Sequence, residues 1–456
     1  MKKAKTQFVC QSCGAVSPRW MGKCPDCESW NSFVEEQEPA SSPSPLHHSH
    51  SGAKAKPVPL SKVERRKEER YRIGMKEFDR VLGGGIVPGS VILLGGPPGI
   101  GKSTLLLQVC ARLIANQKKV LYVSGEESPT QIKMRADRLG IASDDFLLLV
   151  ETNVDAIRDC LYDVKPDFAV VDSVQTVFSP QMESLPGNIS QVRYCGHALT
   201  SAAKELHIPL FMVGHVTKDG NIAGPRVLEH LVDGLILFEG DGEHLYRLLR
   251  AAKNRFGSTD EVGIFEMTDA GVREVANPSE YLLSDRTESA SGTAVTVCLE
   301  GSRSFLVELQ ALVSPTNYGM PQRTATGVDQ RRLAILLAVL EKRLGLRFGQ
   351  HDVFVNAAGG LRLVEPAVDL ALAVAMVSSL RDRAVPPGMA FVGEVGLTGE
   401  VRGISQIEKR MTEAERLGFE RIMIPARNRK GLQNKSSLKL VPVETVQQAV
   451  QTLSLI

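Results

Sequence analysis

A run of eight residues has the types and spacing needed to hold a triphosphate: Gly96-Pro97-Pro98-Gly99-Ile100-Gly101-Lys102-Ser103. It fits the pattern of a phosphate-binding loop, in which glycines let backbone N–H groups approach phosphate oxygens closely. The ammonium of Lys102 would reach the β- and γ-phosphates, and the hydroxyl of Ser103 would bind Mg²⁺. With Thr104 in the first turn of the helix that should follow, the stretch predicts a site for ATP or GTP.

Such a loop works only between a strand and a helix. The aliphatic run Val91–Leu94 leads into it, and the helix-prone run Thr104–Val109 leads out of it. The strand then delivers the loop, and the helix N-terminus directs its unpaired N–H groups at phosphate. This context favours a nucleotide site over a chance match in a glycine-rich turn.

Three more polar positions follow predicted strands. Asp172 ends an apolar strand and is expected to hold the water shell of Mg²⁺. Glu126 and Glu127 form an acidic pair, one of which can polarise the attacking water. We favour Glu126, although an N-capping role for Glu127 in the next helix is equally reasonable. His215 either senses the γ-phosphate or is an ordinary surface histidine.

A second basic motif, Lys253-Asn254-Arg255-Phe256-Gly257, lies far along the chain from the phosphate loop. Because it follows one of the last strands of the sheet, it should not easily reach the phosphate loop of the same chain. Because side chains at i and i+2 of an extended segment share a side, Lys253 and Arg255 point the same way. They suit the γ-phosphate of a neighbouring subunit, as an arginine finger does. The alternative is a solvated basic turn.

Near the N-terminus, two Cys-x-x-Cys pairs are separated by a short loop: Cys10, Cys13, Cys24 and Cys27. Four thiolates at this spacing predict a closed, structural Zn²⁺ site rather than a disulfide pair or a redox motif. The module is too small to have its own core, so the metal must hold it together. Trp20 and Trp30 flank the site and either pack on it or contact a partner or a base.

The composition is that of an ordinary soluble protein, with 43% hydrophobic and 23% charged residues and a net charge of +2 over 456 residues. No apolar run is long enough to cross a membrane, and no secretory signal follows the basic first residues. We therefore expect a cytoplasmic protein without membrane partners. Residues 35–70 are rich in Pro, Ser and His and then in charge, which predicts a flexible linker and tether.

Beyond the linker, apolar runs alternate with helical stretches, which predicts a doubly wound parallel sheet. The strands that follow the phosphate-loop strand are expected at residues 120–124, 146–150, 168–172, 210–214, 235–238 and 245–251. Two long loops, Phe178–Val192 and Val216–His230, follow strands and should carry function. From about Thr293 a second α/β unit begins, with no nucleotide motif or metal cluster of its own.

The order of these parts resembles that in the RadA (Sms) family of bacterial DNA repair proteins. The zinc ribbon, Gly83–Lys102, Lys253–Gly257 and the C-terminal unit carry the resemblance, which covers nearly the whole chain. It implies an α/β protein with a RecA-like parallel-sheet ATPase core and a C-terminal α+β domain like that of Lon proteases. The implied parts are a ribbon at 1–34, the linker at 35–70, the ATPase domain at 71–285 and the Lon-like domain at 286–456.

The resemblance also implies kinship with ring helicases of the DnaB type. The segment Ser124–Ile132 is similar to theirs, and there the first acid of the pair is catalytic, which selects Glu126 over Glu127. His215 lies where those proteins have a glutamine that senses the γ-phosphate. The two long loops correspond to loops that bind DNA at the centre of a ring.

The C-terminal unit resembles the proteolytic domain of Lon in Gly393–Val401 and in Glu365-Pro366-Ala367. Lon uses a Ser/Lys dyad, but the Ser position is Ala367 and the Lys position is Glu408. The adjacent Lys409 would point about 100° away around a helix. We therefore expect a scaffold for oligomerisation and DNA contact rather than a protease. Five arginines are candidate phosphate contacts or else belong to solvated faces: Arg323, Arg331, Arg332, Arg343 and Arg347.

Together these features predict a DNA-dependent ATPase of the helicase type. It would bind single-stranded and branched DNA and promote branch migration with RecA, as a homo-hexamer. Lys102, Glu126 and Asp172 would act in cis, and Lys253 and Arg255 in trans. The alternatives are a KaiC-like regulatory ATPase ring and, disfavoured by Ala367 and Glu408, an ATP-dependent protease.

Overall fold

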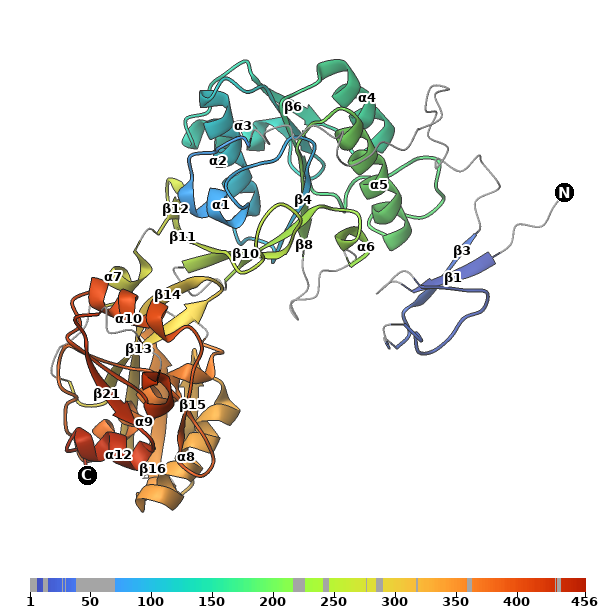
Figure 1. The fold of residues 1–456 in the computed structure, drawn as a ribbon. Coiled ribbons are helices and arrows are strands. Elements are labelled where there is room, and N and C mark those ends of the chain that lie inside the picture. The colour runs from blue at the N-terminus through green and yellow to red at the C-terminus, as the bar shows by residue number, and fades with distance from the viewer. Residues whose placement is uncertain are drawn as a thin grey trace, which may run out of the picture. The chain divides into compact units, whose positions relative to one another are not determined.

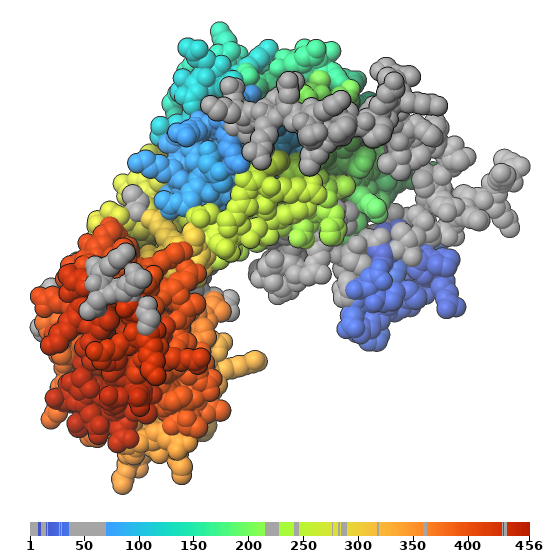
Figure 2. All heavy atoms as spheres, in the orientation of Figure 1, coloured from blue at the N-terminus to red at the C-terminus, as the bar shows by residue number. Residues whose placement is uncertain are grey.

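The computed structural model describes residues 6–10, 15–26, 28, 30–37, 70–215, 226–240, 246–275, 277–283, 290–316, 319–358, 363–430, 432 and 436–456. The chain forms two compact units, one of Met1–Glu239 with Leu248–Glu274 and one of Gly240–Arg247 with Val275–Ile456 (Figure 1). Figure 2 draws the heavy atoms of the chain as spheres in the same orientation. Among the helices so described, none has the length and apolar character needed to cross a bilayer.

The N-terminal module is a small antiparallel sheet in the order β2-β1-β3. Its strands are β1 Thr6–Cys10, β2 Val16–Ser17 and β3 Phe33–Gln37. Cys10, Cys24 and Phe33 form its buried cluster. A cluster this small supports the expectation that a metal is needed to hold the module together.

The central sheet has nine strands in the order β12-β11-β10-β9-β4-β8-β7-β5-β6. Strands from β9 to β6 in that order are parallel, which confirms the predicted fold class. The strands are β4 Val91–Gly96, β5 Val120–Ser124, β6 Phe146–Val150, β7 Phe168–Asp172, β8 Leu210–His215, β9 Gly234–Glu239, β10 Tyr246–Asn254, β11 Val262–Thr268 and β12 Gly271–Glu274. The helices are α1 Lys76–Val81, α2 Lys102–Ala115, α3 Pro129–Arg138, α4 Val154–Val164, α5 Ile189–Glu205 and α6 Arg226–Glu229.

Strand β10 departs from the predicted parallel arrangement, because it runs antiparallel to β9. The reason is the connection between them, residues 240–245, which is too short for the crossover that a parallel pair requires. The last strands, β11 and β12, are also antiparallel to each other.

Both faces of the parallel sheet are buried, and alternate residues of each strand face different cores. Ile92 and Leu94 of β4 belong to the core that includes residues of α1, α2 and α3. Val91 and Leu93 belong to the core that includes residues of α4, α5 and α6. Figure 1 shows the two sets of helices on opposite faces of the sheet. The sheet is therefore packed between two layers of helices, which hold the carboxyl ends of its strands in place.

The second unit contains a seven-stranded sheet in the order β15-β16-β14-β13-β17-β20-β21. Its strands are β13 Thr293–Glu300, β14 Arg303–Pro315, β15 Arg323–Thr326, β16 His351–Ala357, β17 Met389–Phe391, β20 Arg421–Pro425 and β21 Lys439–Val443, with the separate pair β18 Glu394–Val395 and β19 Val401–Arg402. Its helices are α7 Pro278–Leu282, α8 Gln330–Leu344, α9 Asp369–Arg381, α10 Ile407–Arg416, α11 Ala426–Arg429 and α12 Val446–Thr452, with 3₁₀ turns η2 Phe348–Gln350 and η4 Pro366–Val368.

Helix α9 is the centre of this unit. It packs on β13 and β14, and α8 and α12 pack on it in turn. Its residues from Asp369 to Ser378 are all buried, as expected for a helix that is apolar all round. A separate core includes residues of α10 together with Val297, Leu306 and Ile422 of the sheet.

Candidate active site and family

The phosphate loop lies between β4 and α2, as its sequence context predicts. Gly99 has φ of +77° and Gly101, the N-cap of α2, has φ of +108°, a region that L-residues with side chains rarely adopt. A Cβ at Gly101 would also lie 2.3 Å from Cε of Met267. Ser103 and Thr104 are half-buried in the first turn of α2, whose leading N–H groups have no helical acceptors. The local geometry therefore suits a bound phosphate.

Lys102 is buried, with 5% of its surface exposed. Its Nζ donates to the carbonyl oxygens of Gly96 and Pro97, at 2.8 and 2.9 Å. Burial lowers the pKa of Lys102, while the nearby charges of Asp172 and Glu126 partly offset that effect. The ammonium is thus held inside the loop, close to both acids that the sequence selected.

The carboxyl ends of the parallel strands bring the predicted cis-acting residues to one edge of the sheet. Ser124 of β5 lies beside Asp172 of β7, and Gly96 of β4 lies beside His215 of β8. The backbone therefore places His215 next to the phosphate loop, while its side chain lies outside the described residues.

Asp172 has a fixed orientation. Its Oδ2 accepts a hydrogen bond of 2.6 Å from the hydroxyl of Tyr122, which comes from the neighbouring strand β5. Burial, and then the charge of Asp172, raises the pKa of Tyr122 well above its usual value, so the phenol stays protonated. The sequence analysis did not identify Tyr122, because the contact depends on strand order.

The two acids after β5 have different surroundings. The hydroxyl of Ser173 donates to Oε1 of Glu126 at 2.5 Å. Glu127 instead forms an ion pair of 2.7 Å with Arg135 of α3. The alternative N-capping role of Glu127 is wrong, because Ser128 is the N-cap of α3 and forms a capping box with Gln131.

Lys253 and Arg255 lie away from this edge. Lys253 Nζ donates to the carbonyl oxygen of Glu229 at 2.6 Å, and Arg255 Nη1 pairs with Oδ1 of Asp233 at 2.9 Å. Asp233 is bonded to Val91, at the start of β4. Gly96 lies five residue steps after Val91, or about 16 Å of strand at ~3.3 Å per residue. The two cations are therefore near the amino edge of β4, opposite their own phosphate loop.

The other residues of this motif attach it to the segment after α1. Asn254 donates through Nδ2 to the carbonyl of Val81, and its Oδ1 accepts from the N–H of Phe256. Gly257 approaches Gly83 so closely that a Cβ on Gly257 would lie 2.9 Å from the Cα of Gly83. Asn254 and Gly257 therefore hold the backbone of the motif in place.

The first of the two predicted DNA loops precedes α5 and is held by the buried Gln191. Its Oε1 accepts from the N–H of Ser179 at 2.9 Å, and its Nε2 donates to the carbonyl of Ser184 at 2.8 Å. This loop therefore has a defined shape in the protein alone. Most of the second loop, residues 216–225, lies outside the described residues.

In the N-terminal module, Cys10 and Cys24 are both 0% exposed and lie in the same cluster. They come from different Cys-x-x-Cys pairs, as a shared metal ion requires. Cys13 and Cys27 lie outside the described residues. The two sulfurs that can be placed fit a common thiolate site.

Comparisons with known proteins agree with this architecture. Residues 8–35 match the family described as rubredoxin metal binding domain, residues 67–221 match AAA domain, and residues 346–455 match Lon protease (S16) C-terminal proteolytic domain. DNA repair protein RadA of Halalkalibacterium halodurans is 52% identical over 452 residues, which is 99% of both chains. The chain belongs to the RadA family of DNA repair proteins. RadA of Bacillus subtilis is 50% identical and RadA of Listeria monocytogenes is 52% identical, each over 99% of both chains.

The Lon-like domain of this RadA family member contains the two residues that are expected at the positions of the Lon dyad. Ala367 is buried at the position of the Lon serine, and Glu408 lines an open cavity of about 710 Å³ together with Lys409. Arg410, which is 0% exposed, pairs with both oxygens of Glu365 and donates to the carbonyl of Val297 at 2.6 Å. Neither Ala367 nor Glu408 is the serine or lysine of such a dyad, and a scaffold rather than a protease stays our prediction.

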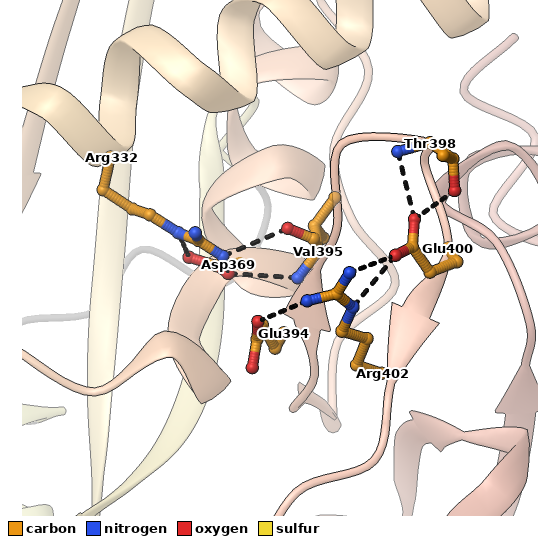
Figure 3. A network of polar contacts seen from close by, with 7 residues as sticks. All are labelled: Arg332, Asp369, Glu394, Val395, Thr398, Glu400 and Arg402. Atoms are coloured by element: carbon orange, nitrogen blue, oxygen red, sulfur yellow. Dashed lines mark hydrogen bonds and ion pairs between the residues drawn. The ribbon is translucent and has the colours of Figure 1, made fainter.

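One of the five candidate arginines in this domain is engaged within the protein itself. Arg332 forms a two-pronged ion pair with Asp369, which is 0% exposed, and also donates to the carbonyl of Val395 at 3.1 Å (Figure 3). Burial raises the pKa of Asp369 despite this pairing. Arg332 therefore connects α8 to the start of α9. The remaining four arginines are exposed: Arg323, Arg331, Arg343 and Arg347.

Proposed function

We propose that this chain is a DNA-dependent ATPase motor of recombinational repair. It binds single-stranded and branched DNA and extends heteroduplex by branch migration in cooperation with RecA. The name DNA repair protein RadA, borne by relatives that match over nearly their full length, supports the repair role. The convergence of Lys102, Glu126 and Asp172 at one sheet edge supports ATP hydrolysis.

In this proposal, each residue of the nucleotide site has a defined role. Lys102 and the first-turn N–H groups of α2 bind the phosphates. Ser103 and Asp172 would hold Mg²⁺, which would supply positive charge near the transferred phosphoryl group. Glu126 accepts a proton from the attacking water. Its contact with Ser173 holds the carboxylate in place between turnovers.

The position of Lys253 and Arg255 supports an active site that is shared between subunits. Both cations are bonded near the amino edge of β4, so they do not serve their own phosphate loop. A homo-hexameric ring supplies them to the next subunit, where they stabilise the charge of the transition state.

The decisive experiment measures ATP turnover by the full-length protein with and without single-stranded DNA. Turnover should rise severalfold on DNA, and a RecA-generated joint molecule should be extended only when ATP is present. Lys102→Ala protein serves as the control for contaminating ATPases. A KaiC-like regulatory ring would instead hydrolyse ATP at the same rate whatever the DNA length, and that result would count against the motor.

A second prediction concerns the zinc module. Cys24→Ser should reduce bound zinc from about one ion per chain to near zero, because three thiolates no longer close the tetrahedral site. Atomic absorption measures the metal, and calorimetry should show that the melting transition of the ATPase domain is retained. Cys160→Ser, on α4, is the matched control and should leave zinc unchanged. Equal loss of stability in both parts would show that the module does not fold independently.

A further inference from the structure

We propose that Asp233 is the positioning residue of the trans-acting finger. It holds the guanidinium of Arg255 in the orientation needed to meet the nucleotide of a neighbouring copy of this chain. The inference rests on the proposed function, because it requires Arg255 to act on a second subunit.

The carboxylate of Asp233 is buried, with 5% of the residue exposed, and both of its oxygens are engaged. Oδ1 accepts from Arg255 at 2.9 Å and from Lys204 of α5 at 3.1 Å. Oδ2 accepts from the N–H of Val91 at 3.1 Å. Hydrogen bonds between charged groups are about twice as strong as neutral ones, so this carboxylate is a firm anchor.

The backbone around Asp233 is equally fixed. Its N–H donates to the carbonyl of Val91 at 2.8 Å, and its carbonyl accepts from the N–H of Arg255 at 3.0 Å. Val232 on one side is fully buried. On the other side a Cβ at Gly234 would lie 2.6 Å from Cδ1 of Ile92, so the chain lies against β4. Asp233 is fixed in position by these contacts. It therefore restrains the side chain of Arg255 rather than moving with it.

Arg255 presents the rest of its guanidinium outward. Its side chain is 54% exposed, and Asp233 takes only Nη1. No acceptor among the residues placed by the structure takes the other guanidinium N–H groups. They are available for oxygens of an incoming phosphate, which the planar guanidinium binds in two-pronged fashion. Anchoring one edge of the group lowers the entropy lost when the other edge engages.

A purely structural role for Asp233 predicts a different outcome, and this makes the inference testable. If Asp233 served only to hold the first residue of β4, its loss would impair the phosphate loop of the same chain. If it positions Arg255, its loss impairs the site of the next chain. The two cases are separated by mixing subunits.

The experiment uses full-length Asp233→Asn, alone and co-expressed with Lys102→Ala under a second tag, followed by tandem purification. Alone, Asp233→Asn should lower kcat roughly 10-fold to 100-fold, the effect of a small misplacement of a catalytic group, with little change in the Kd for ATP. In mixed rings, the Lys102→Ala chain supplies an intact Asp233–Arg255 pair to its neighbour. The ATP turnover of the mixed rings should then exceed the summed turnover of Asp233→Asn and Lys102→Ala measured separately. Lys204→Ala, which removes the other cation from the same carboxylate, should have a much smaller effect on kcat.

The same mixing with Arg255→Ala separates failure of this inference from failure of the proposed function. Rescue of Arg255→Ala without rescue of Asp233→Asn means that Asp233 acts in cis, and the positioning role is wrong. If neither variant is rescued, or if the two tagged chains do not co-purify, the proposal that Arg255 acts on a neighbouring subunit is wrong. If Asp233→Asn does not fold, Asp233→Glu keeps the charge, displaces the carboxylate by one methylene and must show the same rescue.

Discussion

Lys102→Ala is expected to reduce ATP turnover by roughly 10²- to 10³-fold or more, which is the cost of removing one preorganised donor to developing charge. The ammonium lies within the phosphate loop, where burial has already removed most of its water. Removing it leaves the phosphates of ATP without their cationic partner in the loop. Because Lys102 donates to carbonyls of the loop itself, the sheet and α2 should remain folded without it. Steady-state phosphate release, with and without DNA, measures the effect.

The matched control is Lys133→Ala. Lys133 is an exposed lysine of α3 paired with Asp137, and surface pairs of this kind contribute little. Its turnover should equal that of the wild type. Turnover by Lys102→Ala within threefold of the wild type, with a normal melting temperature, would mean that Gly96–Ser103 is not the hydrolytic site.

Glu126→Gln is expected to lower kcat by roughly 10²- to 10⁴-fold, the usual contribution of a general base, while ATP still binds. The amide keeps the size of the side chain and can still accept from Ser173, but it cannot take a proton from water. Single-turnover hydrolysis measures the chemical step, and a fluorescent ATP analogue measures binding. A loss of binding equal to the loss of kcat would contradict the assignment of Glu126 as base.

Glu127→Gln is the adjacent control with the same chemistry. It weakens the ion pair to Arg135, so it should lower the melting temperature slightly and leave kcat near that of the wild type. If Glu127→Gln showed the larger loss of kcat, the roles of the two acids would have to be exchanged.

The sequence was most informative where a single segment carries the whole signal. The strands at 120–124, 146–150 and 168–172 have the predicted bounds, because each is a continuous run of apolar residues. The phosphate loop and the order of the domains were likewise predictable from local patterns. The antiparallel β10 was not, since its direction depends on the length of the connection rather than on its own residues.

Contacts between distant segments were beyond the reach of local patterns. Tyr122 meets Asp172 because β5 and β7 are neighbours in the sheet. Asp233 meets Arg255 because β10 turns back along β9. From the sequence, Arg332 could be an exposed helix arginine, but in the fold Asp369 of α9 lies beside it. Local sequence identified the candidate residues, and the tertiary fold determined their partners.

The ion pair of Arg410 and Glu365 has an evolutionary consequence. Here, removal of either partner would leave a charge in or near the core, at a cost of roughly 3 kcal/mol, the low end for a buried pair because Glu365 keeps some exposure. Lineages descended from this chain should therefore change the two positions together or not at all, because selection for folding alone keeps the pair.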